Sequence, residues 1–371
     1  MSMIIQESAY DAWLASVCLP CGMLIDLLEH YGSAFHCYEA FEQHDETLHM
    51  FIPARFYQLL ANNANTGFIR KMSRAANRNS IKTVHIMDED YPDTLRSLDD
   101  PPAILFYQGE LECTKDRILS MVGSRAASYA GQKAARRLAE DLSRNGVTVV
   151  SGLASGIDAS AHKGCIDGKS PTIAVLGCGL DRPYPADNLS LRDEILNRGG
   201  LILSEYAPGE KAYGWHFPVR NRIIVGLSQA LILMEARIRS GSMTSVRHAL
   251  DQGKDVFVYP GDPLSEYYEG NHQLLREGGT YFTSAFDILE DMHWLDNPPS
   301  VRQNSDCVQA YQPSSPEEQA VIKALKPGAL SFEQLIASTD IDPSVLMSTL
   351  TILQIRGMID ALPGKHYQLK Q

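Results

Sequence analysis

The sequence contains no run of about 18 consecutive apolar residues, the length that a membrane-spanning helix requires. Its N-terminus also lacks the basic flank and apolar core that mark a secretory signal. The seven cysteines are an odd number scattered over 371 residues, which argues for free thiols in a reducing compartment and against a disulfide framework. These absences predict a cytoplasmic protein that does not bind a membrane.

Motifs of several enzyme classes are missing as well. No Gly-x-x-x-x-Gly-Lys-Ser/Thr loop is present, which excludes ATP hydrolysis by a P-loop. Gly177-Cys-Gly179 begins like a dinucleotide fingerprint, but Arg182 stands where a third glycine should allow close helix packing. No His, Cys and carboxylate cluster has metal-ligand spacing, and no serine lies in a nucleophile elbow. We therefore expect no metal, no cofactor and no catalytic residue, hence a protein that is not an enzyme.

An excess of positive charge is also absent. The net charge of −12 counts against nucleic acid, because affinity for a polyanion comes largely from released counterions. The charge is unevenly distributed, however. Residues 117–144 contain six Lys or Arg and two Asp or Glu, whereas the first fifty residues are rich in acid. Binding partners must therefore be judged from local charge.

The length and the 44% hydrophobic content predict two or three folded units. Residues 1–82 show short amphipathic helices, with Leu24, Leu27 and Leu28 at helical spacing. Residues 83–295 form the expected core. Residues 296–316 lack periodicity and are rich in Pro, Ser, Gln and Asn, which is typical of a linker. Residues 317–371 show three helices and a hairpin, which predicts a winged-helix-like module.

The core consists of apolar runs that alternate with helical patterns. Continuous apolar runs are typical of strands buried on both faces, and their alternation with helices predicts a Rossmann-like, doubly wound parallel sheet in an α/β fold. The six predicted strands cover residues 118–122, 147–150, 172–176, 201–204, 230–234 and 255–259.

Glycine-rich and hydroxyl-rich loops follow several of these strands. Ligands of such sheets gather outside the carboxyl ends of the strands, so these loops should meet at one rim. Glycines let backbone N–H groups approach an oxyanion, and arginines bind phosphate with two N–H groups at once. The candidate phosphate ligands are Gly123, Ser124, Arg125, Ser151, Gly152, Ser155, Gly156, Arg220, Asn221, Arg222, Ser240, Gly241, Ser242 and Thr244.

For some of these residues, and for their neighbours, a structural role is the alternative to ligand binding. Trp215 and Phe217 are candidate platforms for stacked bases, although Phe217 is as often a core residue. One of Arg220 and Arg222 is expected to form a salt bridge between helix and sheet. Asp158 and Glu235 are expected to cap helices or hold those arginines, and His162 to pack inside.

An ordered set of motifs resembles the DNA-processing protein A family (DprA, also called Smf) and spans more than a third of the chain. The set comprises Gly123-Ser-Arg125, residues 151–158 with Ala161-His162, Gly177-Cys-Gly179, Tyr184-Pro185, residues 217–228, residues 240–244, Tyr259-Pro-Gly261 and Gly270-Asn271.

The resemblance implies an extended Rossmann-like fold whose aromatic and arginine residues grip single-stranded DNA. It adds Asn271 to the candidate site. It also adds Lys211, because this chain has Gly214-Trp215-His216 where the family often carries a basic residue before Phe-Pro. It further implies that the protein protects incoming DNA, loads the RecA recombinase during natural transformation or recombination, and dimerises through its core. The first 82 residues resemble the sterile-alpha-motif-like or helix-hairpin-helix part of some members, although a packing or dimer-contact module without a DNA role fits them equally well.

Two other functions remain open. The core is similar in outline to lysine-decarboxylase-like phosphoribohydrolases, which cleave nucleoside monophosphates, but Arg239-Ser-Gly-Ser-Met-Thr244 lacks the glycines of their Pro-Gly-Gly-x-Gly-Thr loop. The winged-helix-like module could read duplex DNA. Its presumed recognition helix, residues 343–356, has only one arginine, so we expect this module to contact protein or to modulate binding.

Overall fold

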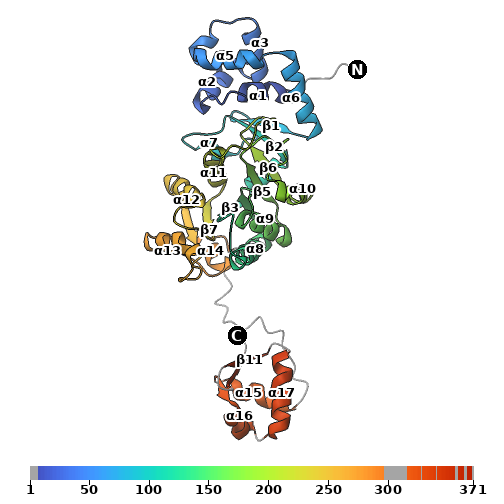
Figure 1. The fold of residues 1–371 in the computed structure, drawn as a ribbon, viewed down its shortest axis with the longest axis vertical. Coiled ribbons are helices and arrows are strands. Elements are labelled where there is room, and N and C mark those ends of the chain that lie inside the picture. Colours follow the sequence, from blue (N-terminus) through green and yellow to red (C-terminus); the bar gives the residue numbers. More distant parts are fainter. Residues whose placement is uncertain are drawn as a thin grey trace. The chain divides into compact units, whose positions relative to one another are not determined.

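The computed structural model describes residues 7–295, 316–326, 328–339, 341–355, 358–362 and 366–369. The chain divides into two compact units, residues 1–295 and 296–371, which Figure 1 shows in sequence colours. The linker predicted over 296–316 lies outside the described residues, apart from Pro316. Across the described ranges, no helix is both long enough and apolar enough to span a membrane.

The first unit begins with the predicted helical module. Trp13 is buried at its centre and meets the rings of Tyr38 and Phe41 edge-on, with centroids 5.0 and 5.5 Å away. Gly32 ends the second helix with a φ of 78°, a left-handed conformation that suits glycine, and Ser33 caps the third helix. The helices are α1 (Ser8–Ala15), α2 (Cys21–Tyr31), α3 (Ala34–Glu42), α4 (Leu48–Phe51), α5 (Ala54–Asn63) and α6 (Thr66–Arg78).

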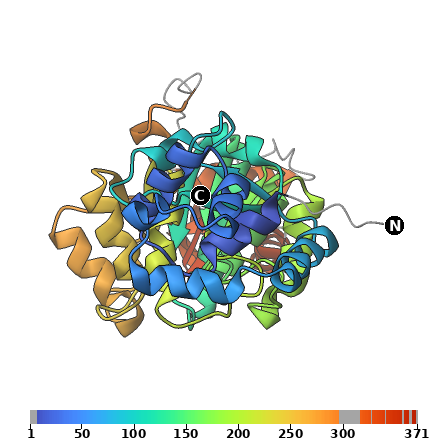
Figure 2. The same cartoon turned by 90° about the horizontal axis from the view of Figure 1, so that it is seen from above.

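The helical module and the sheet share one hydrophobic core. The cluster around Trp13 continues into Ile104 and Phe106 of the sheet. Asp11 of α1 is fully buried and accepts hydrogen bonds from Thr83 Oγ1 at 2.6 Å and from His85 Nε2 at 2.8 Å. Figure 2, seen from above, shows the helices of this module in front of the core. The module is therefore packed against the core by apolar and polar contacts.

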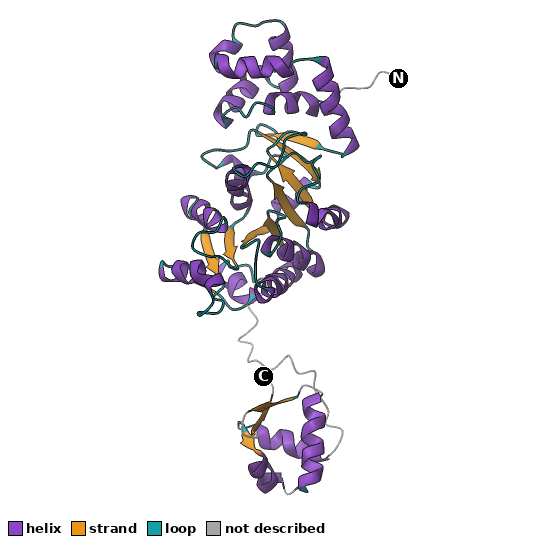
Figure 3. Cartoon of the chain, in the orientation of Figure 1, coloured by secondary structure: helices purple, strands orange, loops and turns teal. Residues whose placement is uncertain are grey.

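The core is a nine-stranded sheet with the order β1-β2-β6-β5-β4-β3-β7-β8-β9. Figure 3 shows its strands in orange between purple helices. Strands β3 to β9 are parallel, whereas β2 pairs antiparallel with both β1 and β6. The strands are β1 (Lys82–His85), β2 (Ile104–Gly109), β3 (Arg117–Val122), β4 (Val147–Ser151), β5 (Thr172–Leu176), β6 (Leu201–Ser204), β7 (Ala230–Leu233), β8 (Asp255–Val258) and β9 (Thr280–Tyr281).

The predicted α/β fold with a mostly parallel sheet is confirmed, and all six predicted strands are present, as β3 to β8. Strands β1, β2 and β9 were not predicted. Two of them are short and lack a continuous apolar run, since β1 reads Lys-Thr-Val-His and β9 has only two residues. The third, β2, reads Ile-Leu-Phe-Tyr-Gln-Gly, so its apolar run was visible in the sequence and the prediction missed it.

Helices cover both faces of the sheet. One face packs against α8 (Tyr129–Arg144), α9 (Ile157–Gly168), α10 (Leu189–Asn197) and α14 (Ala285–Asp291). The other packs against α7 (Asp93–Arg96), α11 (His216–Leu227), α12 (Ser242–Asp251) and α13 (Glu269–Arg276). Strand β3 lies between β4 and β7. The helix that follows β3, α8, covers one face of the sheet, and the helix that follows β7, α12, covers the other. Such a switch in strand order opens a crevice at the carboxyl ends of the strands.

The second unit has the predicted winged-helix architecture. Leu335, Leu346 and Leu350 are buried in its own small core. Its three-stranded antiparallel sheet has the order β10-β12-β11, and the predicted Pro-Gly turn lies outside the described residues. The elements are α15 (Pro316–Leu325), β10 (Leu330–Ser331), α16 (Phe332–Thr339), α17 (Pro343–Ile355), β11 (Ile359–Leu362) and β12 (His366–Leu369).

Candidate functional site

A cavity of about 560 Å³ opens where the strand order switches, beyond the ends of β3 and β7. Three segments distant in sequence line it: residues 122–126 after β3, residues 214–224 around the start of α11, and residues 240–245 around the start of α12. Ala154 and Asp158 complete the wall. Nine of the predicted site residues line this rim cavity, namely Gly123, Ser124, Arg125, Phe217, Arg220, Asn221, Ser240, Gly241 and Ser242.

Close backbone packing shapes the floor of the rim cavity and requires glycine. A Cβ on Gly123 would lie 2.5 Å from Ile157 Cγ1 at the start of α9. Gly156 has a φ of 83°, and a Cβ there would lie 2.4 Å from the carbonyl oxygen of Ser124. The loop after β3 therefore rests directly on the N-terminus of α9, which explains why both motifs carry a glycine at these positions.

Arg125 is exposed at the mouth of the rim cavity. Its guanidinium carbon lies 4.6 Å from the centroid of the Phe217 ring, a cation–π contact worth about 0.5–1 kcal/mol at an exposed site. The side chain makes no hydrogen bond or ion pair with the residues that the structure describes. The contact with Phe217 thus orients the guanidinium and leaves its N–H groups free for an anion.

Arg220 lies deeper in the rim cavity and is only 4% exposed. Its Nη1 donates to the carbonyl oxygens of Gly152, at 3.0 Å, and Val175. Its Nη2 has no hydrogen-bond partner, and no ion pair joins it to a carboxylate, within the described part of the chain. A Cβ on Gly152 would come within 2.6 Å of Nη2, so only glycine leaves room for the guanidinium. The charge of Asp158 acts on Arg220 without forming an ion pair. A buried cation with an unused N–H group and no ion pair within the described residues favours an anionic ligand.

Arg222 lies only two residues further along α11, but unlike Arg220 it is paired with carboxylates. Its Nη2 pairs with Glu205 Oε1 at 2.5 Å, and its Nε pairs with Asp100 Oδ2 at 3.3 Å. It lines a separate cavity of about 150 Å³ between the helical module and the core. The expectation that one of the two arginines forms a salt bridge is therefore met by Arg222.

The remaining predicted residues do not line the rim cavity, and two of them have internal roles. Ser151 is fully buried and donates to the carbonyl oxygen of Met121 at 2.7 Å. Asn271 is also fully buried; its Oδ1 accepts from the N–H of Ala236, and its Nδ2 donates to the carbonyl oxygen of Tyr259. These two residues hold the rim loops in place instead of facing the cavity. The full set outside the cavity lining is Ser151, Gly152, Ser155, Gly156, Lys211, Trp215, Arg222, Thr244 and Asn271.

Two carboxylates near the rim, predicted to cap helices or to hold arginines, accept hydrogen bonds from neighbouring loops instead. Glu235 is fully buried and accepts hydrogen bonds from the N–H group and the hydroxyl of Ser128, directly before α8. Asp158 accepts from the N–H of Ala154 and faces the rim cavity. Burial raises the pKa of Asp158, and the charge of Arg220 opposes that shift. Among the described residues, no three His, Cys, Asp or Glu side chains gather as metal ligands would.

His162 packs inside α9, as predicted, and makes the fold sensitive to acid. Its Nδ1 lies 2.8 Å from Thr172 Oγ1. Burial, reinforced by the charge of Arg220, lowers the pKa of His162 from 6.5 to about 3. Because the unfolded chain binds the proton more readily, His162 destabilises the fold as the pH falls below 6.5, by about 2 kcal/mol between about pH 7 and pH 5.

The substitution His162→Gln should remove this part of the pH dependence. Urea unfolding of both proteins at the two pH values measures the free energy of unfolding. The drop between the two pH values should be about 2 kcal/mol smaller in the variant than in the wild type. Equal drops in the two proteins would show that the imidazole is not held neutral in the folded state.

Comparisons with known proteins point to the same protein family for both units of the chain. A family model described as "DNA recombination-mediator protein A" matches residues 82–293, and one described as "DprA winged helix domain" matches residues 307–365. The DNA processing protein DprA of Streptococcus pneumoniae is 43% identical over 209 residues, which cover 56% of this chain and 73% of that protein.

Two solved structures are also similar to this chain. DNA processing protein A from Streptococcus pneumoniae has a TM-score of 0.64 and 32% identity, over 78% of this chain and 99% of that one. DNA processing protein A from Helicobacter pylori, described for its single-stranded DNA binding mode, has a TM-score of 0.52 and 30% identity, over 57% of this chain and 95% of that one.

Proposed function

This chain belongs to the DNA recombination-mediator protein A family, also known as DprA or Smf, and from that premise we propose that it binds single-stranded DNA at the rim cavity. One observation carries the proposal: Arg125 and Arg220 both face a cavity of about 560 Å³ with N–H groups that no described residue uses. The similar protein from Helicobacter pylori is described as a single-strand binder, which supports the same ligand here.

The rim supplies groups for a phosphate backbone. Arg220 offers its Nη2 at the base of the cavity and Arg125 its guanidinium at the mouth. The hydroxyls of Ser240 and Ser242 are 2.6 Å apart, at the start of α12, where the helix dipole also favours negative charge. Such contacts hold the strand without reading its sequence. The Phe217 ring lines the cavity beside them, and stacking of one base on it would contribute about 1–3 kcal/mol.

Membership of the family also suggests the cellular process in which this protein acts. We propose that the protein acts in the cytoplasm on DNA entering recombination or transformation, protects the strand and delivers it to the RecA recombinase. A homodimer formed through the core would join two rims into one longer track. Family resemblance supports the RecA and dimer steps; no contact within the described residues identifies either surface.

The winged-helix unit suits a protein partner better than a duplex. On α17, Val345, Met347 and Ile352 are each 41–44% exposed, and the helix Pro343–Ile355 carries no Lys or Arg. Reading a duplex requires cations on this face. We therefore assign the unit a role in protein contact or in modulating binding.

Fluorescence anisotropy with labelled oligothymidine and with a duplex of equal length tests the proposed function. The full-length protein should bind the single strand at least tenfold more tightly than the duplex, since stacking on Phe217 requires an unpaired base. Incubation with nucleoside monophosphates is the matched control, and no free base should be released. Equal affinity for both DNA forms would contradict the proposal. Release of free base would instead favour the hypothesis that the protein is a phosphoribohydrolase.

A further inference from the structure

We propose that the exposed face of α6 is a second phosphate-binding surface for the strand that occupies the rim cavity, so that the helical module forms part of the DNA track. This inference rests on the proposed function and extends it to a module that the sequence left without a role. The basic face of α6 is defined here as Arg70, Lys71, Arg74 and Arg78.

The local charge of this region differs sharply from that of the whole chain. Residues 47–87 contain no Asp or Glu and six Lys or Arg, in a chain whose net charge is −12. All four cations of the basic face are exposed. No ion pair joins any of them to a carboxylate of the described residues. By contrast, Arg136 and Arg144 on α8 are paired with Asp167 and Glu140, so they are less available to a ligand.

Helix geometry arranges these cations in a row. Arg70, Arg74 and Arg78 are four residues apart, so they follow one side of α6 over about 12 Å, at a rise of about 1.5 Å per residue. The opposite side, with Ile69, Met72, Ser73 and Ala76, is buried against the module. Like charges at this spacing destabilise a helix by about 0.2–0.5 kcal/mol per pair, and no nearby acid offsets them. A bound polyanion would neutralise these repelling charges, so the row of arginines is suited to binding one.

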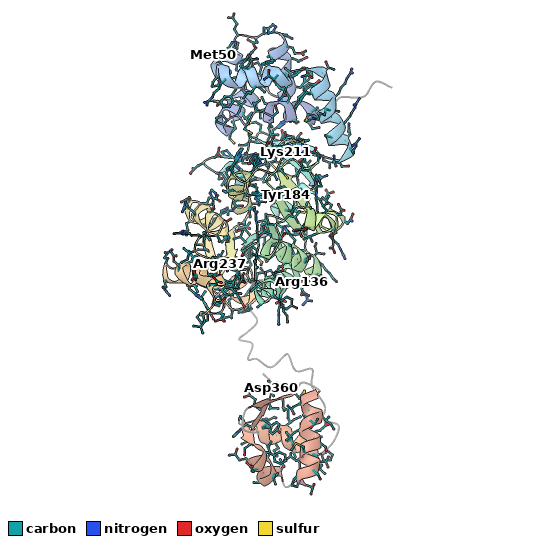
Figure 4. All side chains as sticks on the ribbon, in the orientation of Figure 1. Met50, Arg136, Tyr184, Lys211, Arg237 and Asp360 are labelled. Atoms are coloured by element: carbon teal, nitrogen blue, oxygen red, sulfur yellow. The ribbon has the colours of Figure 1, made fainter. Side chains whose placement is uncertain are left out.

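Packing connects α6 to the rim. A Cβ built on Gly209 would lie 3.9 Å from Met72 Cε of α6 and 3.9 Å from Arg182 Nη2. Gly209 lies in the loop between β6 and α11, residues 205–215, which also carries Lys211 and Gly214, and Gly214 lines the rim cavity. Figure 4 shows Lys211 at the junction between the helical module and the core. The loop therefore packs against the buried side of α6, opposite the basic face, and also lines the rim cavity, so one segment connects this helix to the cavity.

The same loop presents two aromatic rings to solvent. Tyr213 is 46% exposed and Trp215 is 58% exposed. Their ring planes differ by 12° and their centroids are 6.5 Å apart, while the buried His216 meets both rings edge-on. Bases stack on such exposed rings, and each stack contributes about 1–3 kcal/mol. A strand leaving the rim cavity would thus pass these rings and Lys211 before it reaches α6.

Other surfaces of the module and other partners fit less well. The hairpin between α2 and α3 is flanked by Asp26, Glu29, Glu39 and Glu42, which would repel phosphate. A membrane-binding helix needs exposed apolar side chains beside its cations, and α6 has no exposed large hydrophobic residue. The charge of the basic face and its connection to the rim favour the DNA strand.

The test compares two full-length triple variants with equal loss of charge. One carries Arg70→Gln, Arg74→Gln and Arg78→Gln. The control carries Lys163→Gln, Arg198→Gln and Arg276→Gln, which remove exposed cations that form no ion pair with described residues. Anisotropy is measured with oligothymidine of about 6 and about 25 nucleotides at several salt concentrations.

The α6 variant should bind the long strand about ten- to a hundredfold more weakly than wild type at about 0.1 M salt. Its salt slope should be shallower by about 2, since each of three lost contacts contributes about 0.7. Its affinity for the short strand should equal that of wild type, and the control should bind both strands like wild type. Wild-type affinity of the α6 variant for the long strand, or equal weakening on both strands or in both variants, would overturn the inference. Failure of wild type to bind even the short strand would refute the proposed function itself.

Discussion

Replacing Arg222 by methionine is expected to lower the free energy of unfolding by about 3–5 kcal/mol, because it leaves the carboxylate of Glu205 without its partner. The Arg222 side chain is 9% exposed and that of Glu205 is 18% exposed, and their charged atoms lie 2.5 Å apart. Asp100, the other partner, is 62% exposed and contributes little. Urea unfolding followed by circular dichroism measures the loss.

A double variant is the control for this prediction. Arg222→Met together with Glu205→Leu removes both charges and should recover most of the lost stability, since no unpaired buried carboxylate remains. The folded fraction of Arg222→Met should bind single-stranded DNA like wild type, because Arg222 does not line the rim cavity. A loss below about 1 kcal/mol, or a clear loss of DNA affinity in the folded variant, would contradict the structural role.

The substitution Arg220→Met is expected to act mainly on binding: DNA affinity should fall about ten- to a hundredfold. The free energy of unfolding should fall by about 1–3 kcal/mol, less than in Arg222→Met, because the carbonyl oxygens of Gly152 and Val175 lose a donor but no ion pair is broken. A hydrogen bond to a charged group contributes about 1.5–3 kcal/mol, which corresponds to that range in affinity. Burial already lowers the pKa of Arg220, so the cation is held in the fold against an unfavourable environment. Methionine is apolar and unbranched, and it can occupy the same space beside Gly152.

Anisotropy with oligothymidine and urea unfolding, carried out on the same preparation, check both halves of this prediction. Arg220→Met and Arg222→Met are matched variants, since they make the same chemical change two positions apart on α11. If Arg220→Met bound DNA like wild type, the cavity would not be the binding site. If both variants lost stability alike, the two arginines would have the same role.

The features that could be predicted from sequence are those that depend on local pattern. Continuous apolar runs predicted β3 to β8, because a strand covered on both faces has no polar side to interrupt it. Glycine and hydroxyl blocks after β3 and β7 predicted six residues of the rim cavity, because parallel strands bring their carboxyl ends to one side. The run at the start of α11 predicted three more, Phe217, Arg220 and Asn221. The helical and winged-helix modules followed from helix periodicity and turn residues.

Other features depend on contacts between distant segments and could not be predicted. The sequence shows two arginines around Asn221 but not that Glu205 lies beside Arg222 while Gly152 lies beneath Arg220. It also does not show that Ser151 and Asn271 face inward. The acid-free stretch 47–87 is visible in the sequence, and a local charge count over it would have revealed the basic face of α6.

The salt dependence of binding tests the central claim most directly. The full-length protein and the double variant Arg125→Ala with Arg220→Met are titrated with oligothymidine over a range of salt concentrations, and log Kd is plotted against log salt. Two lost phosphate contacts should make the slope of the variant shallower by about 1.4, with an affinity at low salt reduced at least tenfold. An unchanged slope and an unchanged affinity would show that these arginines do not contact the strand, and that the rim of the sheet is not where this protein binds DNA.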